Sequence, residues 1–400
     1  MAKRGINNED VKLSNRALII HIMQKNGVIS RTHLARMSGL QQATITNIIN
    51  DFLDWGLVHE TGLIAGDNGR RTAGLELSCD KYRFISVQIS QEYCTVATFD
   101  IRCNQYLSRS IEFDYSDSIP SILENIKNEI HRQRAVLKKE VLVGIGIAAV
   151  GPLIHESQSI AIHSGVSRLV SQDIRRALEE EFPVPVYFRH DAKAAAYMEW
   201  QRQFNVGDKG ILIYIMTGVW LGSGIVIDGK VLSGYNGIAG EIGHMSIDYQ
   251  GRQCECGRRG CLEQYASAFH IARSLQENIG DFPHSILKKD SNLVEVIAAY
   301  IKEDPLAVKI LDEVGWALGV GISNVINVID PNCIVIGNYF PQAGERLLKT
   351  IMDSIKERSL PQVYNRISIK FSDMGQDAPL RGITMLAIED AVNNNRFFKN

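Results

Sequence analysis

Apolar residues recur every three or four positions in the first part of the chain, as they do along one face of an amphipathic helix. Three such stretches follow one another, at 14–27, 31–39 and 41–56. Ser30 precedes the second stretch and suits the N-cap of a helix. Two short strand-like stretches around a Gly-rich turn come next, at 57–66 and 69–77. Three helices followed by a β-hairpin are the order of a winged helix-turn-helix domain.

From about residue 82 the pattern changes to alternating strands and helices. Strand-like runs rich in Val, Ile and aromatic residues occupy 83–90, 94–100, 104–113, 141–149, 184–191, 211–218, 222–229 and 333–340. Amphipathic helical patterns occupy 118–134, 171–182, 285–303, 305–328 and 382–394. The runs fall into two sets, so we expect two related α/β lobes, each with three antiparallel strands followed by helix-strand alternation.

Length and composition are those of an ordinary globular protein. The chain has 400 residues, of which 45% are hydrophobic and 22% charged. This length allows roughly two to four domains. No apolar run reaches the roughly 18 residues of a transmembrane helix, and the N-terminus lacks the apolar region of a secretory signal. We therefore expect a cytoplasmic protein without membrane insertion.

The charges are unevenly distributed. The whole chain carries 43 Lys and Arg against 45 Asp and Glu, a net charge of −2. Residues 1–72 contain nine basic and six acidic side chains, a net charge of +3, which leaves −5 for the remainder. A basic N-terminal part on an acidic body is a weak indication of nucleic-acid binding at that end.

Polar side chains in the N-terminal helices are of the types that read DNA. Short polar and amide side chains at the start of a helix can reach base edges in the major groove, while arginines contact phosphates or enter the minor groove. The candidates are Ser30, Arg31, Gln41, Gln42, Thr44, Thr46, Asn47, Arg70 and Arg71. The alternative interpretation is a small helical protein-interaction module with a solvated polar face.

Three of the seven cysteines form a cluster. His244 is followed by Cys254, Cys256 and Cys261. Three thiolates and one imidazole satisfy a tetrahedral Zn²⁺, and four protein ligands leave no open position, so we expect a structural zinc. The alternative is a group of reduced surface thiols. The other cysteines, expected to be plain buried thiols, are Cys79, Cys94, Cys103 and Cys333.

The stretch GYNGIAGEIGHMSIDYQGRQCECGRRGCLEQYAS, at 234–267, resembles the ROK family of repressors, open reading frames and sugar kinases. The resemblance covers essentially the whole chain, and the winged head is typical of the Mlc- and NagC-like repressor branch. It implies the sugar-kinase/actin-like fold of two α/β lobes with a cleft between them. The implied domains are a head at 1–80, a first lobe at 81–194 plus 380–400, and a second lobe with the zinc site and an oligomerisation surface at 195–379.

Members of the family bind a sugar in the cleft, and the resemblance assigns this role to particular positions. Carboxylates and imidazoles accept hydrogen bonds from sugar hydroxyls. The residues implied to bind the effector are Asp191, Glu241, His244 and Glu263, together with the neighbouring His190. The resemblance also implies that His244 faces both zinc and sugar. Asp191 falls at the position of the catalytic aspartate of the family's kinases, which acts as a general base.

The chain departs from those kinases where they hold ATP. Their first phosphate loop resembles DIGGT, whereas residues 88–92 here read QISQE, in which both glycines are missing, Gln88 replaces the metal-facing aspartate and Glu92 would repel phosphate. Trp220 lies in TGVWLGSG, where the kinases have a Gly-rich second loop, and His190 replaces an asparagine. Phosphoryl transfer depends on positioned phosphates and Mg²⁺. We therefore expect no enzyme activity and no catalytic residue, with Asp191 retained as a hydroxyl ligand.

These features predict a sugar-responsive repressor of carbohydrate uptake and metabolism genes. A dimer or tetramer would place two heads on a palindromic operator. The effector is a sugar or a sugar phosphate, and a phosphotransferase-system protein is an alternative partner that the resemblance suggests. An active ATP-dependent sugar kinase carrying a DNA-binding head, and an activator in place of a repressor, remain the other interpretations.

Overall fold

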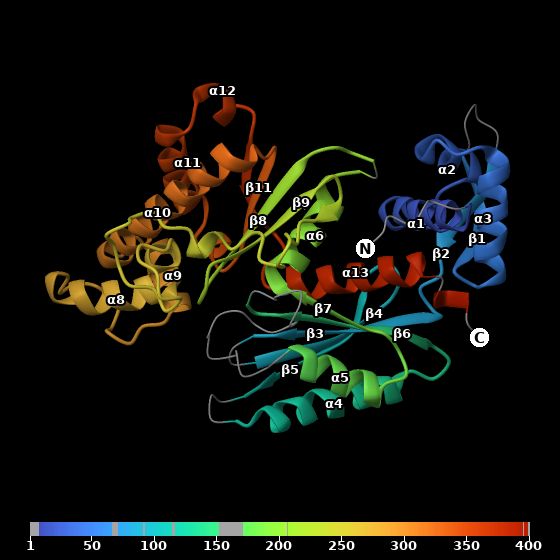
Figure 1. The fold of residues 1–400 in the computed structure, drawn as a ribbon, viewed down its shortest axis with the longest axis horizontal. Coiled ribbons are helices and arrows are strands. Elements are labelled where there is room, and N and C mark those ends of the chain that lie inside the picture. The colour runs from blue at the N-terminus through green and yellow to red at the C-terminus, as the bar shows by residue number, and fades with distance from the viewer. Residues whose placement is uncertain are drawn as a thin grey trace. The chain divides into compact units, whose positions relative to one another are not determined.

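The computed structural model describes residues 8–65, 71–90, 93–113, 117–151, 171–205, 207–394 and 396–398 (Figure 1). The chain forms two compact units. Unit 1 comprises Met1–Ala149, Asp173–Phe188 and Ile383–Asn400, and unit 2 comprises Val150–Gln172 and Arg189–Gly382. Unit 1 contains both the N-terminal head and the first sheet. The three-domain division stays a prediction.

The head has the winged helix-turn-helix order that the sequence predicts. Its elements are α1 (Asn8–Asn26), α2 (Arg31–Ser38), α3 (Gln42–Asp54), β1 (Val58–Ala65) and β2 (Arg71–Leu77). Strands β1 and β2 pair antiparallel, and Ile29 adds an isolated bridge to Leu75. Gly39 ends α2 with a φ of +69°, a left-handed conformation that glycine adopts without strain. The helix faces marked by Ile19, Leu34 and Ile49 are fully buried and form the core of the head.

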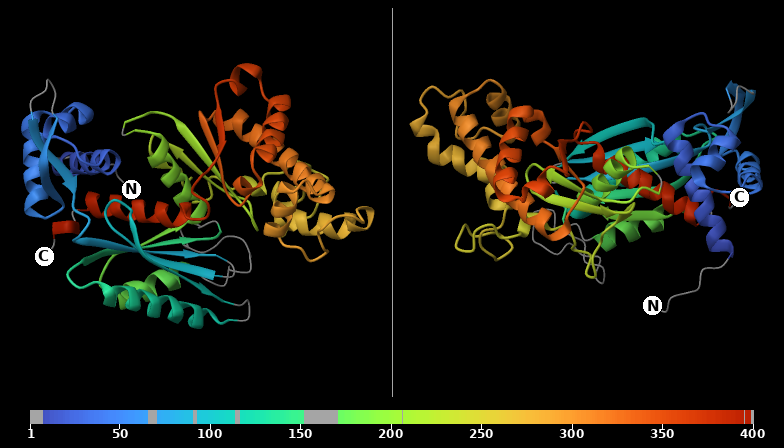
Figure 2. Two further views of the ribbon diagram at one scale, coloured as in Figure 1. Left: turned by 180° about the vertical axis from the view of Figure 1, so that it is seen from behind. Right: turned by 90° about the horizontal axis from the view of Figure 1, so that it is seen from above.

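The sheet of unit 1 has the order β5-β4-β3-β6-β7. Its strands are β3 (Tyr82–Ile89), β4 (Tyr93–Phe99), β5 (Gln105–Glu112), β6 (Val141–Ala149) and β7 (Val186–His190). The first three are antiparallel neighbours, and β6 runs parallel to β3. Helices α4 (Ile119–Val136) and α5 (Ser171–Glu181) cover one face, and α13 (Ala378–Asn393) covers the other (Figure 2). Ser86 and Thr384 share a buried hydrogen bond of 2.7 Å between β3 and α13.

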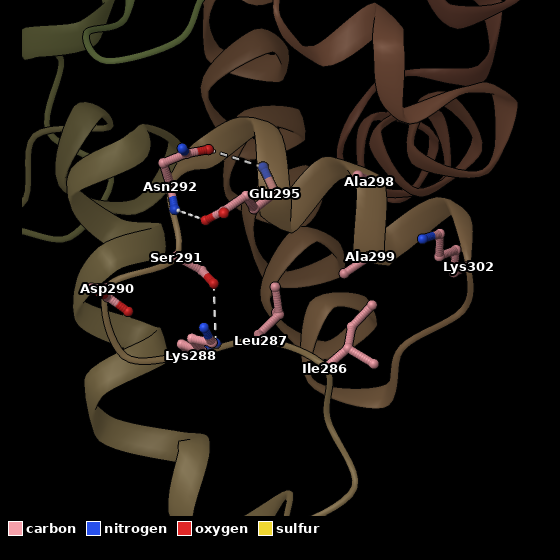
Figure 3. A pocket seen from close by; sticks show the side chains of 10 residues that line it. All are labelled: Ile286, Leu287, Lys288, Asp290, Ser291, Asn292, Glu295, Ala298, Ala299 and Lys302. Carbon is pink, nitrogen blue, oxygen red and sulfur yellow. Dashed lines mark hydrogen bonds between the residues drawn. The ribbon is translucent and has the colours of Figure 1, made fainter.

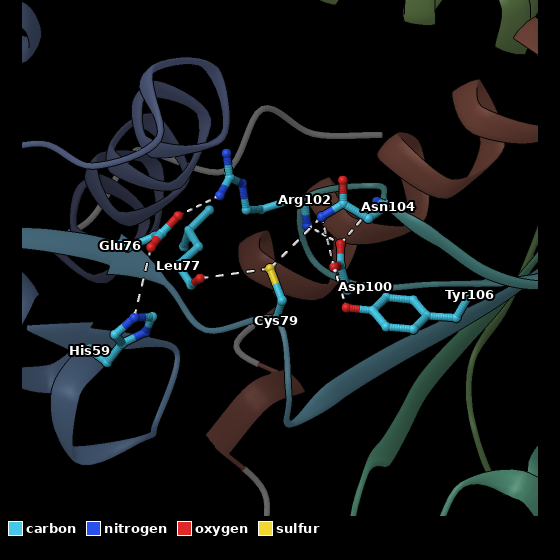
Figure 4. Close-up of polar contacts among 8 residues, drawn as sticks. All are labelled: His59, Glu76, Leu77, Cys79, Asp100, Arg102, Asn104 and Tyr106. Atoms are coloured by element: carbon cyan, nitrogen blue, oxygen red, sulfur yellow. Dashed lines mark hydrogen bonds and ion pairs between the residues drawn. The ribbon is translucent and has the colours of Figure 1, made fainter. Parts of the chain in front are cut away.

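The head is joined to this sheet by polar contacts around one turn (Figure 4). Arg102 Nη1 lies 2.6 Å from Glu76 Oε1 of β2. The fully buried Asp100 carboxylate organises the turn, because it accepts from the backbone N–H groups of Arg102 and Asn104 at 2.8 and 3.0 Å. Cys79 lies beside this turn and is only half-buried, so the expectation of a buried thiol is wrong for this cysteine. It follows β2 in the connection to the lobe, where the chain is not covered on all sides.

Unit 2 repeats the strand topology of unit 1, with the order β10-β9-β8-β11-β12. Its strands are β8 (Ile211–Thr217), β9 (Gly222–Ile227), β10 (Lys230–Val231), β11 (Cys333–Asn338) and β12 (Ser368–Phe371). Again three strands are antiparallel neighbours, and β11 is parallel to both β8 and β12. The shared topology confirms the expected pair of related α/β lobes.

Helices supply most of the core of unit 2. They are α6 (Asp191–Gln203), α7 (Glu263–Ala266), α8 (Ala268–Asn278), α9 (Leu293–Ile301), α10 (Pro305–Ile329), α11 (Glu345–Arg358) and α12 (Pro361–Tyr364). The longest, α10, begins at the N-cap Asp304 with proline in its first turn, and its residues Val314, Leu318 and Ile322 are fully buried. Among the described residues, no helix combines the length and the apolar character needed to cross a membrane.

Candidate functional site

The four predicted metal ligands of unit 2 come together. One ligand atom from each of His244, Cys254, Cys256 and Cys261 lies within 4.8 Å of the others. Cys256 Sγ and Cys261 Sγ are 3.6 Å apart, and Cys254 Sγ is 3.8 Å from His244 Nδ1. Zinc–sulfur bonds of about 2.3 Å in a tetrahedron require sulfur atoms about 3.8 Å apart. The cluster can therefore hold a metal ion of this size.

A tight glycine-containing knuckle brings these ligands together. His244 ends a 3-10 helix at Ile242–His244, and the bridges Gln253–Arg259 and Ser246–Cys261 fold the cysteine segment back on itself. Gly260 has a φ of +71°, and a Cβ atom there would lie 1.6 Å from the Asp248 carbonyl oxygen. No other residue fits this position, so the sequence spacing and the glycine together create the cluster.

The thiols of the cluster differ in their electrostatic surroundings. Burial raises the pKa of Cys261 to about 12, so this thiol stays protonated unless a cation is present. At Cys256 burial is again the largest single influence and raises the pKa, but hydrogen bonds from the Arg258 side chain (Nε at 3.4 Å), from the Arg258 backbone and with the other two thiols together outweigh burial and lower the pKa. Metal binding would therefore release protons from this cluster, as it does wherever thiols become ligands.

Three carboxylates of unit 2 form a second group, in which Asp191 and Glu263 are buried and Glu241 is half-buried. Asp191 begins α6, Glu241 immediately precedes the 3-10 helix that carries His244, and Glu263 begins α7. Asp191 Oδ1 accepts from the Ala192 N–H at 2.6 Å and lies 3.2 Å from His190 Nε2. Glu263 Oε2 accepts from the backbone N–H of Leu221 at 3.3 Å. Within the described part of the chain, the buried Glu241 Oε1 has no hydrogen-bond partner.

Burial dominates the electrostatics of these carboxylates. Burial raises the pKa of Asp191, Glu241 and Glu263 to about 7 each. Glu241 acts further on Asp191, and Glu263 on Glu241, in the same direction. Burial also lowers the pKa of His190 to about 3, so its imidazole is neutral. The three carboxyl groups therefore lose their protons near neutral pH and then act as hydrogen-bond acceptors.

The pKa of Asp191 predicts how the substitution Asp191→Asn affects stability. Between pH 4 and 7 the folded protein keeps this proton and the unfolded chain loses it, so the carboxyl's contribution to stability falls as pH rises toward 7. The asparagine variant lacks this loss. We expect its unfolding free energy to exceed that of the wild type at pH 8 by roughly 2–4 kcal/mol more than at pH 5. Denaturant unfolding at both pH values measures the difference.

Asp228→Asn is the matched control, because that carboxylate is exposed and its pKa is lowered by the hydrogen bond from the Gly210 backbone. The control should show no gain between pH 5 and 8. An equal effect of Asp191→Asn at both pH values would contradict the buried, protonated state of Asp191.

The predicted DNA-binding residues of the head differ in exposure. Gln41, Gln42, Asn47 and Arg71 are exposed, whereas Thr44 and Thr46 are half-buried. Ser30 is the N-cap of α2, as predicted, and its buried hydroxyl accepts from the His33 N–H at 3.1 Å. Arg31 lies 3.1 Å from Glu60 of β1. Arg70 lies outside the described residues. Contact of this set with DNA stays a prediction.

The structure describes part of the two segments that the resemblance aligns with the kinase phosphate loops. Gln88 is buried in β3, and the Ser90 N–H donates to the Tyr93 carbonyl at 2.9 Å in the following turn. Gln91 and Glu92 lie outside the described residues. The Trp220 ring packs on Phe269 with a centroid distance of 4.6 Å.

Two groups that interact with the carboxylate site could not be predicted from sequence motifs. One is the Leu221 backbone N–H, which has no sequence signature. The other is Lys193, a lysine within the alanine-rich start of α6 that is 4% exposed. The one sequence feature that points to Lys193 is its position two residues after Asp191.

A cavity of about 440 Å³ lies elsewhere in unit 2, beside α9 (Figure 3). Its lining includes Ile286, Lys288, Asn292 and Lys302. It contains none of the metal ligands or buried carboxylates. Asn292 and Glu295 exchange the two hydrogen bonds of a capping box, which explains their presence at the start of α9.

Known proteins similar to this chain include regulators and a kinase. The chain is 29% identical to the xylose repressor of Bacillus spizizenii over 383 residues, covering 95% of this chain and 96% of the repressor. It is 34% identical to a glucokinase of Halalkalibacterium halodurans over 251 residues, or 61% of this chain and 76% of the kinase. A ROK family transcriptional regulator, a homolog of E. coli MLC, has a crystal structure that matches with a TM-score of 0.80 at 26% identity, over 97% of this chain and 99% of that one.

The family itself is established by a match over most of the chain. The ROK family model matches residues 84–390, which include both sheets, the cysteine knuckle and the buried carboxylates. The chain belongs to the ROK family.

Proposed function

We propose that this protein is a sugar-responsive, DNA-binding transcriptional repressor of carbohydrate genes. One observation carries the proposal: regulators match nearly the full length, 95% and 97% of the chain, whereas the glucokinase matches 61%. The winged head at residues 8–77 supplies a DNA-reading element. The relatives named repressors include one for xylose, so a pentose or hexose is the effector to test first.

The carboxylates of Asp191, Glu241 and Glu263 are the proposed effector contacts, together with His190 and His244. Ionised carboxylates accept strong hydrogen bonds from hydroxyl groups, and each has unused acceptor capacity. A ligand that favours one arrangement of the two units changes the spacing of paired heads and so the affinity for the operator. The protein acts as a homodimer or a tetramer in the cytoplasm, and a phosphotransferase-system protein is a second regulator to test.

The metal proposed for the knuckle is Zn²⁺, held by His244, Cys254, Cys256 and Cys261. The donor set and the 3.6 Å sulfur separation suit it. Bound there, the ion supplies positive charge that keeps the thiols ionised. Because His244 is both a metal ligand and the last residue of the 3-10 helix, the knuckle then fixes this helix. Glu241, which precedes the helix, is held with it, since the His244 N–H donates to the Glu241 carbonyl at 3.2 Å.

We propose further that the chain does not transfer phosphate. Gln88 and Trp220 stand where the family's kinases carry small or metal-facing residues, and phosphoryl transfer depends on positioned phosphates. A coupled ATPase assay with hexoses and N-acetylhexosamines tests this directly. Turnover at kinase rates would establish the rival function.

The main test is a gel-shift experiment with operator DNA from the protein's own gene neighbourhood. We expect the purified protein to shift this DNA and a sugar to weaken the complex. The same sugar, at 100 times its dissociation constant, should stabilise the protein by about 2.7 kcal/mol in thermal unfolding. A protein that shifts none of these fragments, with or without sugars, is not a local repressor.

A further inference from the structure

Lys193 is a buried lysine in the first turn of α6, two residues after Asp191. It is 4% exposed, although lysines are almost never fully buried unless their charge is paired. Burial lowers the pKa of Lys193, while the charge of Glu241 acts to raise it. A protein keeps such a costly group only where its partners compensate.

Those partners lie on the turn that leads into Glu241. Lys193 Nζ donates to the Gly237 carbonyl at 2.5 Å, a contact between positions 44 residues apart. The turn closes on itself through the Ala239 N–H and the Ser233 carbonyl at 3.1 Å. Its side chains pack little, since Tyr235 is 93% exposed and Ile238 is 46% exposed. Two side chains therefore restrain this turn from outside, Lys193 at Gly237 and the buried Ser223, whose hydroxyl donates to the Gly240 carbonyl at 2.5 Å.

We propose that Lys193 is a positioning residue of the effector site, and that this site takes a neutral sugar through its hydroxyl groups. The inference rests on the proposed function. The ammonium group binds the Ser233–Gly240 turn to α6, the helix that begins at Asp191. It also supplies a positive charge that compensates the charge of Glu241. Both tasks are internal to the protein, so the ammonium is not an anion receptor.

The class of ligand follows from the hydrogen-bonding groups that Lys193 leaves unused. Asp191, Glu241 and Glu263 offer acceptors, and Glu241 Oε1 has no partner in the described structure. Once these carboxyl groups have ionised, which occurs near pH 7, a phosphate or carboxylate group placed among them would meet like charge and would bring them no donors. Sugar hydroxyls are donors without charge, and they satisfy the cluster.

A series at one position separates the two tasks of Lys193. Lys193→Met removes the charge and the hydrogen bond, Lys193→Gln keeps a donor without charge, and Lys193→Arg keeps both. We expect calorimetry with D-xylose and D-glucose to show affinity for the bound sugar at least about tenfold weaker in the methionine variant and within about threefold of the wild type in the arginine variant. Lys230→Met, an exposed lysine on β10, is the control.

Hydrogen exchange of the ligand-free proteins gives an independent readout. Exchange in 233–241 should rise in the methionine variant and return toward the wild-type level with arginine, while α9 and the metal content stay unchanged. A uniform loss of protection would indicate general packing and overturn the positioning role. If the methionine variant is insoluble, the glutamine variant tests the charge alone, and a sugar affinity equal to that of the wild type would overturn the counter-charge role of Lys193.

The outcomes also separate this inference from the proposed function. If the wild type binds neither sugar, the sugar-responsive function and the ligand class are overturned. Hydrogen exchange still tests whether Lys193 restrains the Ser233–Gly240 turn. If the wild type binds sugar, and Lys193→Met binds it equally well and shows unchanged hydrogen exchange, only the role of Lys193 is overturned. Tighter binding of glucose 6-phosphate than of glucose overturns the neutral-ligand class.

Discussion

Cys256→Ser is expected to abolish stoichiometric zinc binding and to destabilise unit 2. Serine is a poor zinc ligand, and three remaining ligands leave an open position in a site built for four. Removing one partner from a buried charge cluster costs about 3–5 kcal/mol, which corresponds to a fall in Tm of roughly 6–20 °C for a unit of this size. Metal analysis of the purified protein and calorimetric unfolding measure the two effects.

Cys79→Ser is the matched control, since Cys79 is a half-buried thiol of unit 1 that lies outside the cluster. It should retain one zinc per chain. The chelator-treated wild type should unfold near the temperature of Cys256→Ser, and added zinc should restore only the wild type. A variant that melts at the wild-type temperature and still binds one metal would exclude the proposed structural site.

Asn47→Ala combined with Gln42→Ala is expected to remove specific operator binding. Both side chains are exposed on α3, which holds the position of a recognition helix in the head. Each amide can make two hydrogen bonds to adenine, and a good bidentate contact contributes about 1–3 kcal/mol to discrimination. We therefore expect operator affinity to fall by roughly 30-fold or more, while binding to unrelated DNA changes little. Fluorescence anisotropy at fixed salt measures both.

Asn128→Ala is the control for this pair, because it makes the same chemical change at an exposed position of α4, outside the head. It should leave operator affinity unchanged. An equal loss on operator and unrelated DNA would assign α3 to phosphate contact in place of base reading. Unchanged operator affinity in the double variant would remove α3 from the interface.

Local sequence patterns were sufficient for the elements and for the metal cluster. The Ser30 cap, the glycine at the end of α2 and the buried face of α3 all act within a few residues, so periodicity and capping predict them. The cysteine knuckle is equally local, since the four ligands lie within 18 positions of one another, from 244 to 261. Cys79 was misjudged because its exposure depends on how the head meets the first sheet.

The residues of the carboxylate site and their surroundings are identified by two different kinds of evidence. Asp191, Glu241 and Glu263 were named through resemblance to the ROK motif, and the structure gives them their buried surroundings and raised pKa values. Neither the Leu221 N–H nor Lys193 could be placed this way. Their partners, Glu263 and Gly237, lie 42 and 44 residues further along the chain.

A winged head, two α/β lobes and a four-ligand knuckle can be predicted from the sequence, because each follows from periodicity, turn chemistry or short spacing. Which charges are buried together follows only from the way the chain packs. This packing sets the charges of Lys193 and Glu241 against each other, and burial raises the pKa values of Asp191, Glu241 and Glu263 to about 7. Burial and long-range contacts are properties of the packed chain, and no local pattern of residues encodes them.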